Sequence, residues 1–114
     1  MENLVRVIDP NALDDLVERS RHQPVVIFKH SITCPLSALA YRQMSKFDGE
    51  VTLVEVQRAR ELAREIENRT GITHQSPQVL VLRNGQVVWN ASHLQITAGA
   101  VARAVSQAVA GTSK

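Results

Sequence analysis

The sequence predicts an α/β fold in which a mixed sheet of four or five strands is flanked by helices. Uncharged apolar runs at residues 25–28 and 79–82 alternate with stretches whose apolar residues recur at helical spacing. The pair Asn84-Gly85 separates the last two strand candidates and indicates an antiparallel hairpin. Alternating strands and helices followed by a hairpin predict a single sheet that contains both parallel and antiparallel strands.

Length and composition are those of a globular domain. The chain has 114 residues, 44% of them hydrophobic and 21% charged, and we expect a single domain over residues 1–114. The net charge of +2 comes from scattered residues, which argues against a nucleic-acid partner. No signal peptide is recognised and no apolar run approaches the length that spans a bilayer, so we expect a cytoplasmic protein with no membrane partner.

The elements are predicted from apolar periodicity and from the residues that end each stretch. In chain order they are an optional edge strand at 4–7, a helix from Asp9-Pro10 to before Pro24, a strand at 25–28, a helix from Pro35 to Asp48-Gly49, a strand at 51–56, a helix at 59–70, strands at 79–82 and 86–89, and a helix from Thr97 to near Gly111. In the last helix, Val101, Ala104, Val105, Ala108 and Val109 form the expected apolar stripe. This order is typical of the thioredoxin-like fold.

Cys34 is the strongest candidate for a reactive residue. It follows a buried strand and directly precedes the helix that starts at Pro35, where unpaired backbone N–H groups and the helix dipole stabilise a thiolate. A buried structural cysteine is the alternative, but the turn position favours a reactive thiol. Because Cys34 is the single cysteine, no disulfide can form within these 114 residues, and a reducing compartment would keep the thiol free.

Ser37 lies three residues after Cys34, where a dithiol oxidoreductase would carry its second cysteine. Its hydroxyl cannot resolve a disulfide, but it can donate a hydrogen bond to the thiolate; a solvated serine near a helix start is the alternative. A mixed disulfide on Cys34 would therefore wait for an external thiol. Thr33 and Pro35 complete the predicted catalytic turn.

Ser76-Pro77 directly precedes a predicted strand, at the place where thioredoxin-like folds carry a cis-proline that faces the reactive cysteine. We expect Ser76 and Pro77 to form the substrate-binding loop, with Thr33 and Pro77 on either side of the sulfur. A trans proline that opens an edge strand is the alternative.

Other polar residues give weaker indications. His30, His74 and His93 lie in three separate predicted loops with no close ligand pair, so we expect no metal site and no tightly bound cofactor. Whether any of the three assists Cys34 stays open, with a structural role as the alternative. One helix alternates basic and acidic residues, which indicates a solvated face without a ligand site. These residues are Arg58, Arg60, Glu61, Arg64, Glu65, Glu67 and Arg69.

Four short motifs resemble the monothiol bacilliredoxin family, also called YtxJ. They are Phe28-Lys29-His30-Ser31, Thr33-Cys34-Pro35-Leu36-Ser37, His74-Gln75-Ser76-Pro77-Gln78 and Trp89-Asn90-Ala91-Ser92-His93, with Ile96-Thr97 after them. The resemblance extends from about Val25 to the last helix and implies a thioredoxin-like fold with Cys34 as nucleophile. It also implies a monothiol oxidoreductase that removes bacillithiol, or another low-molecular-weight thiol as co-substrate, from thiol-modified client proteins, with free thiol or a disulfide reductase clearing Cys34. Leu94 departs from the aromatic residue that is usual in the family.

Two other functions remain open at this point. One is a monothiol glutaredoxin-like protein that uses glutathione, with or without a bridging iron–sulfur cluster, although the Gly-rich thiol-binding segment of that group is missing after the proline strand. The other is a non-catalytic thioredoxin-like adapter or stress protein whose Cys34 is only capped by small thiols under oxidation.

Overall fold

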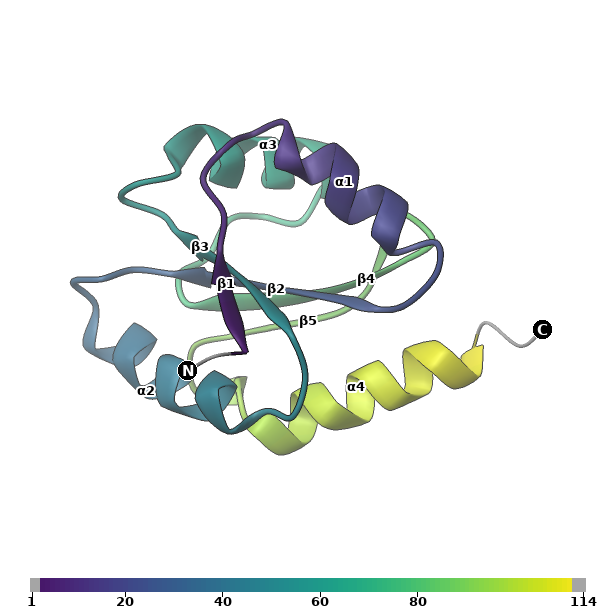
Figure 1. Cartoon of the computed structure of the whole chain (residues 1–114). Helices are drawn as coiled ribbons and strands as arrows, with labels where there is room; N and C mark the ends of the chain where they lie inside the picture. The colour runs from purple at the N-terminus through teal and green to yellow at the C-terminus, as the bar shows by residue number, and fades with distance from the viewer. Residues whose placement is uncertain (1–2, 112–114) are drawn as a thin grey trace.

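The computed structural model describes residues 3–111 of the chain. Its elements follow one another as β1 (Leu4–Arg6), α1 (Ala12–Arg19), β2 (Val25–His30), α2 (Pro35–Lys46), β3 (Val51–Glu55), α3 (Arg60–Thr70), β4 (Gln78–Arg83), β5 (Gln86–Ser92), the short 3-10 helix η1 (His93–Gln95) and α4 (Ala98–Gly111), as Figure 1 shows. No helix in this part of the chain is long and apolar enough to cross a membrane.

The five strands form one mixed sheet in the order β1-β3-β2-β4-β5. Strands β1 and β2 both run parallel to β3, whereas β4 is antiparallel to β2 and to β5. The mixed sheet flanked by helices is therefore confirmed, and the optional edge strand is its fifth member. The parallel pairing of β2 with β3 brings the carboxyl ends of both strands to one edge of the sheet, next to the turn that leads to Cys34.

Two helices cover each face of the sheet. Helices α1 and α3 lie on one side, and α2 and α4 lie on the other (Figure 1). Strand β2 is buried along its whole length; Val25 and Ile27 pack in the core beneath α1 and α3, while Val26 and Phe28 pack in the core beneath α2 and α4. Burial on both faces explains why residues 25–28 of this strand are a continuous apolar run.

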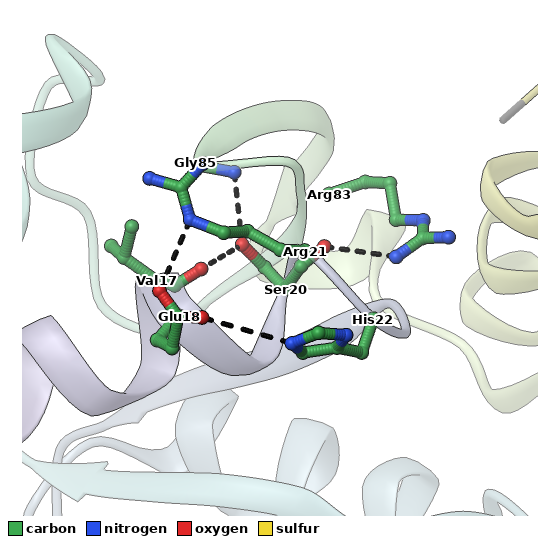
Figure 2. A network of polar contacts seen from close by, with 7 residues as sticks. All are labelled: Val17, Glu18, Ser20, Arg21, His22, Arg83 and Gly85. Atoms are coloured by element: carbon green, nitrogen blue, oxygen red, sulfur yellow. Dashed lines mark hydrogen bonds and ion pairs between the residues drawn. The ribbon is translucent and has the colours of Figure 1, made fainter.

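A hydrogen-bond network joins α1 to the β4–β5 hairpin at the end of the sheet opposite Cys34 (Figure 2). The fully buried Ser20 accepts the backbone N–H of Gly85 on its hydroxyl oxygen at 2.9 Å. Its carbonyl accepts the Asn84 N–H at 2.7 Å and an Arg83 guanidinium N–H at 3.0 Å. Asn84 and Gly85 have φ values of 56° and 77°, which is the left-handed geometry that Asn-Gly hairpin turns require.

Some predicted boundaries were wrong. Helix α1 begins at Ala12 and not at Pro10, because the Asp9 carboxylate accepts the Asn11 N–H at 2.9 Å and forms a turn before the helix. Strand β2 continues to His30, which pairs with Glu55 of β3, and β5 continues to Ser92, which pairs with Gln78. Pairing with neighbouring strands extends both elements beyond their local apolar pattern.

Two features at the C-terminal end also differ from the prediction. The sequence analysis did not predict η1, which joins β5 to α4. Val109, expected in the buried stripe of the last helix, is 54% exposed. Thr97 does cap α4 as predicted, since its hydroxyl oxygen accepts the Ala100 N–H at 3.1 Å.

Candidate functional site

Cys34 is the N-cap residue of α2. Its backbone is extended, with φ of −99° and ψ of 124°, and Pro35 occupies the first helical turn. The Cys34 N–H donates to the Ser31 carbonyl at 3.3 Å, which closes a tight turn between the end of β2 and the helix. The thiol is partly exposed. The local sequence accounts for this geometry, because proline lacks the N–H that a first-turn residue would leave unpaired.

Backbone groups at the helix start lower the pKa of the Cys34 thiol below its ordinary value. The Ser37 N–H is the main cause, and the Leu36 N–H and the Ser37 hydroxyl act in the same direction, whereas desolvation opposes them. These donors favour the thiolate, which is the nucleophilic form of cysteine. The arrangement therefore favours thiol–disulfide exchange.

Ser37 is fully buried beneath the start of the helix, so it is not a solvated serine. Its hydroxyl oxygen accepts the backbone N–H of Ser31 at 3.1 Å. A hydroxyl has one proton to donate, and because its oxygen is engaged by Ser31, that proton is available to Cys34. Ser37 thus links the turn that precedes the cysteine to the sulfur itself.

Gln57, in the segment just after β3, holds the same turn, and it was not among the predicted site residues. Its side-chain carbonyl accepts the Ile32 N–H at 3.1 Å, and its amide donates to the hydroxyls of Ser31 at 2.8 Å and Thr33 at 3.3 Å. Only the strand order could have indicated this residue. Gln57 follows β3, which is the parallel neighbour of β2, so both strands end at the same edge of the sheet.

Pro77 is buried at that same edge, and the peptide bond between Ser76 and Pro77 is cis. It immediately precedes Gln78, which pairs with Lys29 near the end of β2, and its carbonyl accepts the His93 N–H at 3.1 Å. Ser76 is half-buried, and its hydroxyl has no hydrogen-bond partner within residues 3–111. The fold therefore places the Ser76-Pro77 loop and the Cys34 turn at one end of the central strand pair.

The three histidines occupy different environments, and only His74 lies in a loop. His30 is the buried last residue of β2, 5.1 Å from Tyr41 between ring centroids, and burial lowers its pKa. His93 belongs to η1 and has a left-handed φ of 56°. No group of three or more His, Cys, Asp and Glu side chains within the described range 3–111 is arranged to hold a metal ion.

Four exposed apolar side chains, Ile32, Leu36, Leu39 and Leu94, are called the apolar rim here. Ile32 and Leu36, on either side of Cys34, are 47% and 37% exposed. Farther along, Leu39 and Leu94 are 47% and 71% exposed and line a cavity of about 340 Å³ between α2 and η1, together with Arg42 and other residues. Clustered exposed apolar side chains are typical of surfaces that contact other molecules.

The chain matches the family model described as monothiol bacilliredoxin BrxC over residues 6–101. It belongs to the monothiol bacilliredoxin family. The family assignment and the thioredoxin fold support a thiol redox role with protein or thiol partners. The motifs recognised in the sequence thus indicated the correct family.

Several solved structures are similar to this chain. One described as having a thioredoxin fold is 33% identical, with a TM-score of 0.83 and coverage of 90% of this chain and 94% of its own. Thioredoxin from Trypanosoma brucei brucei is 14% identical, with a TM-score of 0.73 and coverage of 93% and 90%. Thioredoxin from Fasciola hepatica is 12% identical, with a TM-score of 0.70 and coverage of 90% and 97%. The last two likenesses concern the fold alone.

Proposed function

We propose that this bacilliredoxin is a monothiol oxidoreductase that removes bacillithiol from protein mixed disulfides in the cytoplasm. The observation that carries the proposal is the position of Cys34: a partly exposed thiol with a lowered pKa at a helix N-cap, and a buried serine where a resolving cysteine would stand. Thr33, Pro35 and Ser37 support the nucleophile, and Ser76 and Pro77 contact the substrate.

The proposed reaction has two exchange steps. In the first, the Cys34 thiolate attacks the bacillithiol sulfur of the client mixed disulfide; a new disulfide forms on Cys34, and the client sulfur leaves as a thiolate that takes a proton from solvent. In the second, the thiolate of free bacillithiol attacks this disulfide, which releases bacillithiol disulfide and regenerates Cys34. Each step exchanges one disulfide for another, so no tightly bound cofactor is needed.

The apolar rim supports a protein client. Ile32 and Leu36 expose apolar surface on both sides of Cys34 in the sequence, and Leu39 and Leu94 expose more of it on α2 and η1. A free small-molecule disulfide would need no such surface. In this proposal the client segment that carries the modified cysteine packs on the rim, and the Ser76-Pro77 loop holds it opposite Cys34.

The experiment mixes reduced protein with one client protein blocked by bacillithiol and, in parallel, by glutathione. We expect one bacillithiol mass to move to Cys34, to persist without added thiol, and to disappear when free bacillithiol is added, as intact mass spectrometry would show. Cys34→Ser should abolish the transfer and remain folded.

Three outcomes would contradict the proposal. Transfer of glutathione in preference to bacillithiol would indicate the glutaredoxin-like function. Release of one client thiol per protein without further turnover, in the presence of excess free thiol, would indicate the non-catalytic adapter. Transfer by the Cys34→Ser variant would show that another group is the nucleophile.

A further inference from the structure

A second cavity lies on the α3 face of the sheet. It has a volume of about 250 Å³ and is lined by residues of α3, of the segment after β3 and of the loop before β4: Val56, Arg60, Ala63, Arg64, Glu67 and His74. It is separate from the groove between α2 and η1, with which it shares no lining residue.

A buried cation without a hydrogen-bond partner in the described part of the chain lies near residues of this cavity. Lys29 is fully buried, and its ammonium nitrogen has no hydrogen-bond partner within residues 3–111. Its charge acts on Glu67 and on His74, both of which line the cavity. A buried ammonium without a hydrogen-bond acceptor is strongly unfavourable, so this position needs a reason beyond stability.

Two more cations lie over the same cavity. Arg60 and Arg64 are exposed, and they are one turn apart on α3, where like charges destabilise a helix. Neither makes an ion pair within 4.0 Å among residues 3–111, whereas Arg58 and Arg69 of the same region are paired with carboxylates. The charged residues of this helix are therefore not simply a solvated face on which every basic residue is paired with an acidic one.

One carboxylate lines the cavity, and its charge favours the protonated form of Lys29. Glu67 accepts the backbone N–H of His74 at 2.9 Å. Partial desolvation and the Lys29 charge lower the pKa of His74, and the Glu67 charge opposes them; a neutral imidazole ring can donate an N–H. The cavity is thus lined by two arginines, one histidine and one carboxylate, and the charge of the buried Lys29 acts on it from nearby.

We propose that this cavity is a binding site for a small oxyanion, a carboxylate or a phosphate group, held by the Arg60 and Arg64 guanidinium groups beside the buried Lys29 ammonium. The guanidinium geometry matches the paired oxygens of such groups. The oxyanion can come from a free metabolite or from the carboxylates of a small thiol. A site for a free anion is independent of the proposed function, whereas a site for the small thiol rests on it.

The test is titration of the full-length protein with inorganic phosphate, with malonate and with reduced bacillithiol, followed by calorimetry and by NMR shifts of the α3 and His74 amides. We expect saturable binding of at least one ligand, with shifts confined to the cavity. Arg60→Gln, Arg64→Gln and Lys29→Met should each weaken binding about tenfold, as expected for loss of a charged partner. Binding of phosphate or malonate would indicate that the ligand is a free anion, whereas binding of bacillithiol alone would indicate that the ligand is the small thiol.

Two controls separate the site from other effects. Arg103→Gln removes the same charge from an exposed arginine of α4, on the other face of the sheet, and should leave the affinity unchanged. Cys34→Ser should also bind normally while losing transfer, so failure of one proposal is distinguishable from failure of the other. The inference is overturned if no ligand saturates the protein, or if Arg103→Gln weakens binding as much as Arg60→Gln and Arg64→Gln.

Discussion

The buried Ser37 hydroxyl oxygen lies 3.1 Å from the backbone nitrogen of Ser31. The serine that stands where a dithiol enzyme has a resolving cysteine therefore also holds the turn that carries the nucleophile. Replacement of Ser37 should therefore change both the pKa of Cys34 and the free energy of unfolding, each through a different hydrogen bond.

Ser37→Ala should raise the pKa of Cys34, because the thiolate loses one of its three donors. We expect transfer to slow about tenfold, and the free energy of unfolding to fall by about 1–3 kcal/mol because the buried Ser31 N–H loses its acceptor. Thiolate absorbance and denaturant unfolding measure the two effects. Ser45→Ala, which removes a hydroxyl bonded to the Tyr41 carbonyl of the same helix, should leave the Cys34 titration unchanged; an unchanged titration in Ser37→Ala as well would contradict the role assigned to Ser37.

Ser37→Cys should convert the protein into a dithiol enzyme. Residue 37 lies one helical turn from Cys34, and the Ser37 hydroxyl acts on the pKa of the Cys34 thiol, so we expect the new thiol to attack a mixed disulfide on Cys34. We expect the bacillithiol adduct to be short-lived and an intramolecular disulfide to replace it, visible as loss of the adduct mass without added thiol. An adduct as persistent as that of the parent protein would show that the buried position cannot reach the sulfur in the required geometry.

Gln57→Leu should loosen the turn without changing the residues next to Cys34. Three hydrogen bonds to Ser31, Ile32 and Thr33 are lost, each contributing about 0.5–1.5 kcal/mol. We expect faster amide exchange at Ile32 and slower transfer. Gln107→Leu, an exposed position on α4, is the matched control. If Ile32 exchanges at the parental rate in Gln57→Leu, Gln57 does not hold the turn in solution.

Lys29→Met should stabilise the protein at neutral pH and change its pH dependence. Burial lowers the pKa of Lys29 from 10.5 to about 8, with Glu67 opposing, so the folded state releases this proton at lower pH than the unfolded chain. Below about pH 8, the burial of the charged Lys29 lowers the free energy of unfolding by its full amount of about 3 kcal/mol. The free energy of unfolding then increases as the pH rises from about 8 towards 10.5.

The measurement for Lys29 is denaturant unfolding of both proteins at pH 7 and pH 10. At pH 7 the Lys29→Met variant should have a larger free energy of unfolding than the parent protein. Between pH 7 and pH 10 its free energy of unfolding should lack the increase that deprotonation of Lys29 gives to the parent protein. Glu67, Arg60, Arg64 and His74 surround the same space and are present in both proteins, so the difference between the two isolates Lys29. Identical pH profiles would mean that the ammonium is solvated in the folded protein.

Ser20→Ala should destabilise the protein by about 1–3 kcal/mol, because the Gly85 N–H at the hairpin turn loses its acceptor. Transfer at 25 °C should be unchanged, since the network in Figure 2 lies at the opposite end of the sheet from Cys34. Urea unfolding and the transfer assay together measure this. A slower transfer by folded Ser20→Ala protein would show that the two ends of the sheet are coupled.

The parts of the site that depend on local chemistry could be predicted from the sequence. A cysteine followed by proline after an apolar run specifies a helix N-cap, and the Cys34-to-Ser37 spacing is one helical turn. Gln57 could not be assigned in this way, because its role depends on which strand lies beside β2. Its contacts join residues 24 to 26 positions apart.

Lys29 shows a different limit of sequence analysis. A lysine after the apolar run at residues 25–28 is ordinarily where a strand reaches solvent, so the predicted strand ended before it. In the structure β2 continues to His30, and Lys29 is fully buried. Lys29 interacts electrostatically with Glu67 of α3 and with His74, residues far along the chain that no pattern within the strand encodes.

The replacement of a resolving thiol by the buried Ser37 hydroxyl also determines how Cys34 responds to oxidants. A sulfenic acid formed on a low-pKa thiol is ordinarily rescued by condensation with a nearby cysteine, and further oxidation to the sulfinic acid is irreversible for most proteins. Here the group one turn away is a hydroxyl, which cannot perform that condensation. Rescue must come from a small thiol in solution, and the mixed disulfide that forms is the same adduct that the proposed reaction places on Cys34.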